Sequence, residues 1–216
     1  DLGGLTYVPV ADANGVVTFT FMVNDGDAWS ASAGTFTMTY TSVNDLPVNT
    51  LGTASAVNED VANAITGSSI ADVDDTSMTS IAITADRGTF TLVTSDATYT
   101  VGTQGTAAST VTLSGTVSDI NVAIATITWT SATDDNTDAV ITVVTTDDES
   151  GADTDTITIV VNAVADSATI ATNANTGGVT EDASTTTSTG TPTVTDPDSG
   201  ENTLTDVSSA ASISGY

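Results

Sequence analysis

The feature that most constrains the fold is a period-two alternation of bulky apolar residues with threonine. It runs through short segments such as "TFTMTYT" (35–41), and it recurs at Ile141/Val143 and Ile157/Ile159. Alternation at this period places apolar side chains on one face of a β-strand and threonines on the other. Gly, Asn, Asp and Pro separate the segments, which is typical of turns between short strands. The pattern predicts an all-β fold built as a Greek-key β-sandwich.

The middle of the chain carries most of the strand signals. The expected strands lie at 51–57, 65–70, 78–84, 88–94, 97–101, 109–114, 124–130, 139–146 and 154–164. One segment, 118–126, has the spacing of a helical turn, with Ser118 or Asp119 as its predicted N-cap.

An internal repeat organises the chain. Four pairs of blocks recur at an offset of 121 to 124 residues: "LTYVPVADANG" (5–15) with "ITWTSATDDNT" (127–137), "TFTMTYTSVND" (35–45) with "TITIVVNAVAD" (156–166), "VNED" (57–60) with "VTED" (179–182), and "ADVDD" (71–75) with "TDPDS" (195–199). A unit of about 120 residues is large enough to bury its own core. The sequence therefore predicts the C-terminal part of one repeat at 1–47, a complete repeat at 48–167 and the N-terminal part of another at 168–216. It reads as a segment of something longer.

The side-chain inventory excludes several functions. The chain has 28 acidic residues, one Arg and no Lys, for a net charge of −27. It cannot displace counterions from phosphate, so we expect neither a nucleic-acid partner nor membrane insertion. Without Cys or His, thiolate chemistry, imidazole bases and the common zinc sites are ruled out. We expect no enzymatic activity, and adaptation to high salt is an alternative reason for the acidity.

The ordered motifs resemble a known family. "LTYVPVADANGVVTFTFMVNDGDAWSASAGTFTMTYTSVNDLP" and "SDINVAIATITWTSATDDNTDAVITVV" resemble the cadherin-like and Ig-like tandem repeats of large secreted bacterial adhesins of the RTX type. "TGGVTEDASTTTSTGTPTVTDPDSGENT" resembles the start of the related VCBS repeat. The resemblance implies cadherin-like β-sandwiches in series, placed outside the cell and stiffened by calcium. It says nothing about the ligand of the parent protein.

The acidic residues concentrate where repeats would meet. If strand direction reverses at each connection, loops from two repeats and the linker between them come together at each junction. The first junction would gather Asp12, Asn44, Asp45, Asp72, Asp74 and Asp147. The second would gather Glu59, Asp60, Asp134, Asp166, Asp196 and Asp198. Six to eight oxygen ligands suit Ca²⁺, although Asp is also ordinary in turns. The second linker, 164–168, lacks the Asn and Pro of the first, so we expect it to be looser.

Three functions remain open. The first is a structural stalk of an extracellular adhesin, stiffened by calcium between neighbouring repeats of the same chain. The second is a subunit of an extracellular filament, sheath or surface layer, in which identical chains complete each other's partial repeats by strand addition. The third is a carbohydrate-binding module that uses Trp29 to stack on a glycan or cell-surface ligand, whereas Trp129 alternates with Ile127 and is expected in the core.

Overall fold

The computed structural model describes residues 4–54, 56–93, 96–170 and 193–197. Its centre is an antiparallel five-stranded sheet. The strand order is β13 (Ala152–Ile159), β12 (Ala139–Thr146), β7 (Ser77–Ala85), β10 (Thr110–Thr116) and β9 (Thr98–Val101). The chain therefore has the all-β fold that the alternation predicted.

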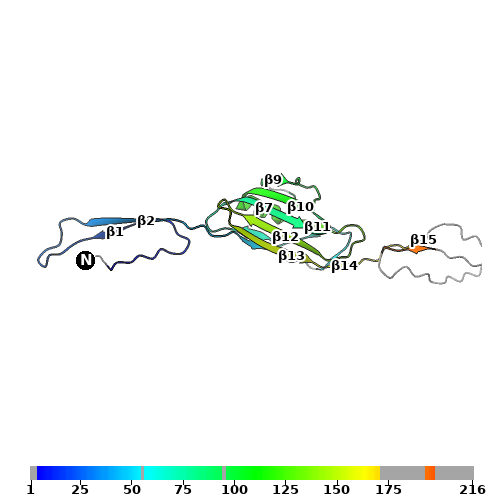
Figure 1. The fold of residues 1–216 in the computed structure, drawn as a ribbon, viewed down its shortest axis with the longest axis horizontal. Coiled ribbons are helices and arrows are strands. Elements are labelled where there is room, and N and C mark those ends of the chain that lie inside the picture. The colour runs from blue at the N-terminus through cyan, green and yellow to red at the C-terminus, as the bar shows by residue number, and fades with distance from the viewer. Residues whose placement is uncertain (1–3, 55, 94–95, 171–192, 198–216) are drawn as a thin grey trace, which may run out of the picture.

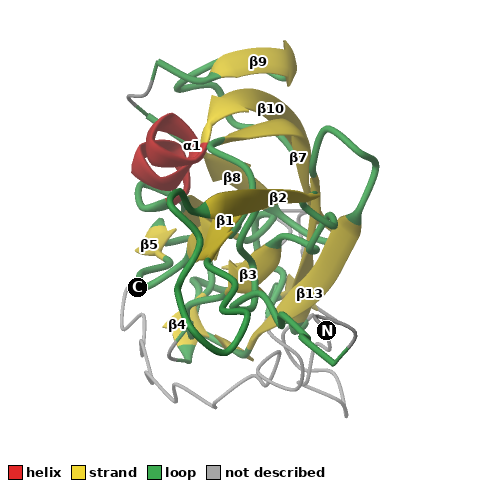
Figure 2. Cartoon of the chain, turned by 90° about the vertical axis from the view of Figure 1, so that its left-hand side faces the viewer, coloured by secondary structure: helices red, strands yellow, loops and turns green. Residues whose placement is uncertain are grey.

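Shorter strands complete the central body. They form three small sheets: β3 (Val48–Thr50) with β6 (Ser69–Ala71); β5 (Asn63–Ala64), β11 (Thr128–Thr130) and β8 (Thr89–Thr91); and β4 (Val57–Asn58) with β14 (Val161–Asn162). The last pair is parallel, whereas the others are antiparallel. The helix α1 (Val117–Ile124) packs against β10 and β6, and Figure 2 shows it beside β10.

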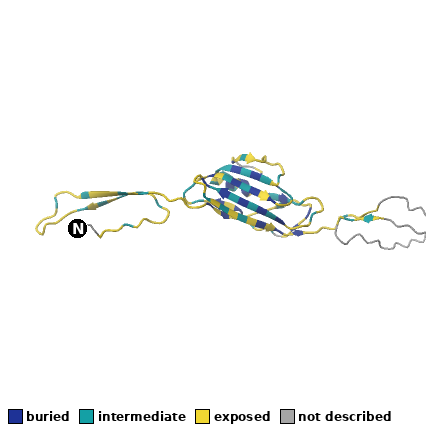
Figure 3. Ribbon diagram, viewed as in Figure 1, coloured by how far each residue is buried: buried dark blue, intermediate teal, exposed yellow. Residues whose placement is uncertain are grey.

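One apolar core holds these elements together. The five-stranded sheet contributes side chains such as Ile83 and Ile141, which are both 0% exposed. The small sheets contribute Phe90 and Trp129, and the helix contributes Ile120. Burying side chains of this size stabilises the fold by about 1.5–3 kcal/mol each. Figure 3 shows that the buried residues concentrate in this central body.

Two strand pairs lie outside the central body, at opposite ends of it (Figure 1). The antiparallel hairpin formed by β1 (Gly15–Phe21) and β2 (Gly34–Tyr40) precedes it. The short pair of β15 (Thr169–Ile170) and β16 (Val194–Thr195) follows it. No helix among the described residues is long and apolar enough to cross a membrane.

Both outer pairs have the register of pairs in the central body. Val17 faces Met38 in the hairpin, and the residues 122 and 121 positions later, Ala139 and Ile159, face each other in β12–β13. Ile170 faces Val194, just as Asn49 faces Ile70 at offsets of 121 and 124. This agreement supports the sequence repeat, and the division at residues 47 and 167 stays a prediction.

Several expected element boundaries were wrong. Of the expected strand 51–57, the described residues keep only Val57, the first residue of β4, and Thr53, which forms an isolated bridge with Thr66. The backbones pack closely here, since a side chain at Gly52 would collide with the Thr66 carbonyl oxygen. The expected strand 65–70 is interrupted by Gly67, whose φ is +89°. The single strand expected at 154–164 breaks at Val160, where the chain leaves β12 and pairs with β4 instead.

The helix also begins earlier than expected. Its N-cap is Thr116, whose hydroxyl accepts a hydrogen bond from the backbone N–H of Asp119 at 3.1 Å. Neither Ser118 nor Asp119 caps it, because both lie inside the first turn. The threonine hydroxyl thus satisfies one of the free N–H groups of the first turn, as an N-cap side chain does.

Candidate metal centre

The linker after the hairpin is bound to two loops at one end of the central body. The Asp45 N–H donates to Asp74 Oδ2 at 2.8 Å, and the Ser42 hydroxyl donates to Asp74 Oδ1 at 3.1 Å. The Asn44 side-chain amide donates to Asp147 Oδ2 at 2.9 Å. The linker therefore meets both the 72–75 loop and the loop that follows β12.

The 72–75 loop is shaped by its own first residue. Asp72 Oδ1 accepts hydrogen bonds from the backbone N–H groups of Asp74 at 2.8 Å and Asp75 at 2.9 Å. This Asx turn is the local reason why Asp occurs here. It leaves Asp72 Oδ2 and Asp75 Oδ2 buried without a hydrogen-bond partner. Such buried acceptors are costly, and they require a donor, a water molecule or a cation.

Asp147 completes the group. It is 1% exposed, and its Oδ1 accepts from the Gly151 N–H at 2.6 Å. Carboxylate oxygens of Asp72, Asp75 and Asp147 all lie within 4.8 Å of one another. Two ligands on opposite sides of a calcium ion, each about 2.4 Å from it, would be about 4.8 Å apart. The spacing, the oxygen chemistry and the unpartnered acceptors together fit a hard cation.

A second group adjoins the first. Oxygens of Asp75, Asp148 and Glu149 also lie within 4.8 Å of one another, so Asp75 belongs to both groups. A hydrogen bond with Asp148, followed by desolvation and by the negative charge of Asp148, raises the pKa of Glu149 to about 7. Hydrogen bonds with Glu149 and with Asp75 lower the pKa of Asp148. The Asp148–Glu149 pair therefore holds an extra proton below about pH 7.

The pKa of Asp45, in the linker, is also raised. The largest cause is desolvation, and the negative charges of Asp12, Asp74 and Asp72 add to it. No basic side chain offsets them, since the single Arg of the chain, Arg87, forms its ion pair with Asp135 at 3.6 Å.

The six residues predicted for the first junction do gather at one end of the central body. Asp12, Asp45 and Asp72 line one surface hollow, and Asn44 and Asp74 make the linker bonds described above. Their individual positions differ from the expectation. Asp74 binds the linker, and its place in the carboxylate group is taken by Asp75.

Sequence reasoning did not choose Asp75, Asp148 or Glu149 as ligands. The signal was present, because each acidic run offers adjacent carboxylates: Asp74-Asp75 and Asp147-Asp148-Glu149. Which carboxylate of a run faces its neighbours depends on the direction of the turn, and here Asp72 sets that direction through its own hydrogen bonds.

The opposite end of the central body holds a third group. Oxygens of Asp60, Asp134 and Asp166 lie within 4.8 Å of one another. Asp60 and Asp134 both have a positive φ, of 59° and 57°, and Asp60 Oδ1 accepts from the Asp134 N–H at 3.2 Å. These three residues were predicted together for the second junction, and the structure brings them together.

Two other residues predicted for the second junction, Glu59 and Asp196, do not belong to this group. Glu59 points inward at 1% exposure, and its Oε1 accepts from the Val164 N–H at 2.8 Å, so it holds the second linker. Asp196 is in none of the acidic groups found among the described residues. Asp198 lies outside the described residues.

The two tryptophans have the predicted exposures. Trp129 is 1% exposed, and its indole Nε1–H donates to the Arg87 carbonyl at 3.0 Å. Trp29 is 66% exposed near the tip of the β1–β2 hairpin. Comparison with known proteins adds no family, because no protein-family model and no curated protein sequence matches the chain.

Proposed function

We propose that the chain is a non-enzymatic structural segment of an extracellular bacterial stalk, in which calcium fixes the linker to the central repeat. The observation that carries this proposal is that the linker forms hydrogen bonds with the loops that hold the carboxylate group at one end of that repeat. Asn44 and Asp45 bind the same two loops that supply Asp72, Asp75 and Asp147.

The mechanism is electrostatic. Without a cation, neighbouring carboxylates repel one another, and buried oxygens of Asp72 and Asp75 have no hydrogen-bond partner. A bound calcium ion would neutralise the charge and supply the missing interaction. The linker forms hydrogen bonds with both loops of the site, the 72–75 loop and the loop after β12. An ion that orders these loops therefore also orders the linker. The segment would be flexible in chelator and stiff at the millimolar calcium concentrations found outside cells.

The stability effect follows from mass action. Extracellular calcium modules bind with dissociation constants of about 10⁻⁴–10⁻³ M. At about 10 mM calcium, one site would then raise the free energy of unfolding by about 1–3 kcal/mol. The unfolded chain gains none of this, because it cannot bring the two loops together.

The test compares thermal unfolding and sedimentation in calcium, magnesium, chelator and sodium chloride of matched ionic strength. We expect calcium to raise the melting temperature and to change the sedimentation coefficient beyond what sodium chloride achieves. An equal effect of sodium chloride would indicate adaptation to salt and would refute the calcium mechanism.

The Asp75→Asn variant provides the residue-level test. In calcium it should lose most of the rise in melting temperature, because Asp75 belongs to both acidic groups at this end. In chelator it should melt higher than the wild type, because it removes one of several repelling charges. The control is Asp96→Asn, an exposed residue outside all three groups, which should respond to calcium as the wild type does.

A further inference from the structure

The five-stranded sheet ends in two edge strands that differ in how they are protected. Its strand order places β13 at one edge and β9 at the other. An edge strand presents unpaired backbone N–H and C=O groups, which can pair with a strand of another chain. Proteins prevent such pairing by placing charged side chains on the edge or by covering it. The protection of each edge therefore shows where a further strand can bind.

The β13 edge is protected in both ways. Asp153 and Asp155 place two carboxylates on this strand. Strand β3 packs against it. Asn49 holds β3 there, because its N–H donates to Asp153 Oδ2 at 2.7 Å and its side-chain amide donates to the Asp153 carbonyl at 3.2 Å. A strand from another chain would meet negative charge and a partly occupied edge.

The β9 edge has neither protection among the described residues. Its sequence, "TYTV" (98–101), contains no charged residue, although the chain carries 28 acidic residues. In the described part of the chain β9 pairs with β10 alone, and Figure 2 shows it at the outer edge of the sheet. Thr98 and Thr100 are exposed, and Val101 is 48% exposed. The outer side of β9 therefore offers backbone hydrogen bonds and some apolar surface without a repelling charge.

We propose that two copies of this chain associate through β9, so that each adds this strand to the sheet of the other. Each copy carries −27, so two copies can approach closely only where both are neutral. The β9 edge meets that condition on both sides of the contact. Antiparallel pairing about a two-fold axis joins the two sheets into one. It also keeps the two Asp96 side chains, which precede β9, at opposite ends of the contact.

The alternation of side chains limits the register of this contact. Residues that face each other in antiparallel strands lie on the same face of the sheet, so Thr100 of one copy faces either Thr98 or Thr100 of the other. In both registers the two Thr100 side chains lie opposite or diagonal to each other, within about 8 Å. Each copy contributes a strand of only four residues, so we expect a weak, concentration-dependent dimer. The inference goes beyond the calcium role and does not depend on it.

The experiment measures the mass of the full chain in chelator by sedimentation equilibrium over a wide range of concentrations. We expect a monomer–dimer equilibrium that sodium chloride strengthens, because salt screens the repulsion between copies. Thr100→Asp brings like charges together and should weaken the dimer about twofold to thirtyfold. The matched control is Thr84→Asp, at an exposed position of the central strand β7, which should dimerise as the wild type does. Circular dichroism checks that each variant is folded.

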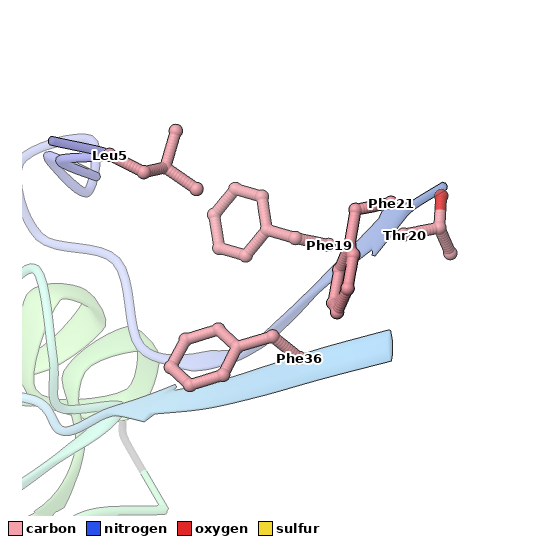
Figure 4. Close-up of a pocket in the computed structure, with 5 residues that line it drawn as sticks. All are labelled: Leu5, Phe19, Thr20, Phe21 and Phe36. Carbon is pink, nitrogen blue, oxygen red and sulfur yellow. The ribbon is translucent and has the colours of Figure 1, made fainter. Parts of the chain in front are cut away.

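The variants also separate β9 from two other surfaces. Association through the outer face of the sheet would be disrupted by Thr84→Asp. The hairpin has an apolar hollow of about 430 Å³, which is lined by Leu5, Phe19, Thr20, Phe21 and Phe36 (Figure 4). Phe36 is 54% exposed, so association through this hollow would be disrupted by Phe36→Asp. A dimer that either variant abolishes and that Thr100→Asp leaves intact would overturn the proposal.

Mixing two charged variants gives the decisive comparison. Thr100→Lys, like Thr100→Asp, brings like charges together when it pairs with itself, whereas a mixed dimer brings Lys and Asp together. Each variant alone should dimerise more weakly than the wild type, and the mixture should form a one-to-one dimer more strongly than either variant. A wild type that stays monomeric, a dimer that forms only in calcium, or a mixture no stronger than its components would each overturn the proposal.

Discussion

Replacing Gly151 with alanine tests how the linker sits on the central body. A Cβ atom built on Gly151 would lie 2.8 Å from Leu46 Cδ2 and 3.1 Å from Asn44 Nδ2, and it would collide with Asp147 Oδ2. These atoms belong to the linker and to the carboxylate that the linker binds. The substitution therefore acts at their point of contact.

The magnitude follows from what must move. Separating Asn44 from Asp147 removes a hydrogen bond to a charged group, which is worth about 1.5–3 kcal/mol. The alanine also restricts the unfolded chain, which returns about 0.4–1 kcal/mol. The net loss in free energy of unfolding is about 1–2 kcal/mol. For a domain of about 120 residues, each kcal/mol lowers the melting temperature by about 3–6 °C.

The assay is differential scanning calorimetry in calcium, combined with sedimentation velocity. We expect Gly151→Ala to melt lower and to sediment more slowly than the wild type, because the freed linker lets the hairpin swing away. Gly4→Ala is the control, since a Cβ there meets no atom within 4 Å. If Gly151→Ala matched the wild type in both measurements, the linker would not be docked on this loop in solution, and the junction described above would be wrong.

Three further predictions address pH, the core and the second linker. The pKa of Glu149 is raised to about 7 from 4.5, chiefly by its hydrogen bond with Asp148, so the folded state holds the extra proton between these values. In chelator the melting temperature should therefore fall as pH rises from about 4.5 to about 7. Calcium titrations should show weaker binding below about pH 7, where the ion must displace that proton. A melting temperature that rises steadily through this pH window would contradict the raised pKa of Glu149. Ile141→Ala should cost about 2–5 kcal/mol in denaturant unfolding because Ile141 is 0% exposed, whereas Phe19→Ala at the matching place of the hairpin should leave unfolding of the central body nearly unchanged. Glu59→Leu should lower the free energy of unfolding by about 1.5–3 kcal/mol, because it removes the acceptor of the Val164 N–H in the second linker. Glu59→Gln keeps an acceptor and should lose much less. Equal losses of the two variants in thermal unfolding would show that the charge matters and the hydrogen bond does not.

The sequence predicted the long strands well and the short ones poorly. Alternation over 139–146 is long enough to define β12 without tertiary information. The strands of two or three residues, such as β4 and β5, exist only because a distant strand pairs with them. Local pattern cannot reveal such pairing. The expected strand 51–57 was wrong for the same reason, because the pairing of Thr53 with Thr66 and of Val57 with Val161 is visible only in the folded chain.

The candidate metal centre shows a similar division. Reversing strand direction at each loop was enough to bring Asp60 together with Asp134, and Asp72 with Asp147, at their respective ends. It could not decide between Asp74 and Asp75, since both follow Asp72 in the same turn. That choice depends on one carboxylate accepting two backbone hydrogen bonds, which is a property of the turn and not of composition.

The parallel pairing of β4 with β14 has a mechanical consequence. Val57 lies near the start of the central repeat and Val161 near its end, and the Val57 and Glu59 N–H groups donate to the carbonyls of Val160 and Asn162 at 2.9 and 3.1 Å. A pull on the two ends of the repeat drags these parallel strands past each other along their length. The pulling force then acts on both hydrogen bonds at the same time, so they must break together and not one after the other. The short pair therefore resists extension of the repeat in shear, because both hydrogen bonds must break together before β4 and β14 can part.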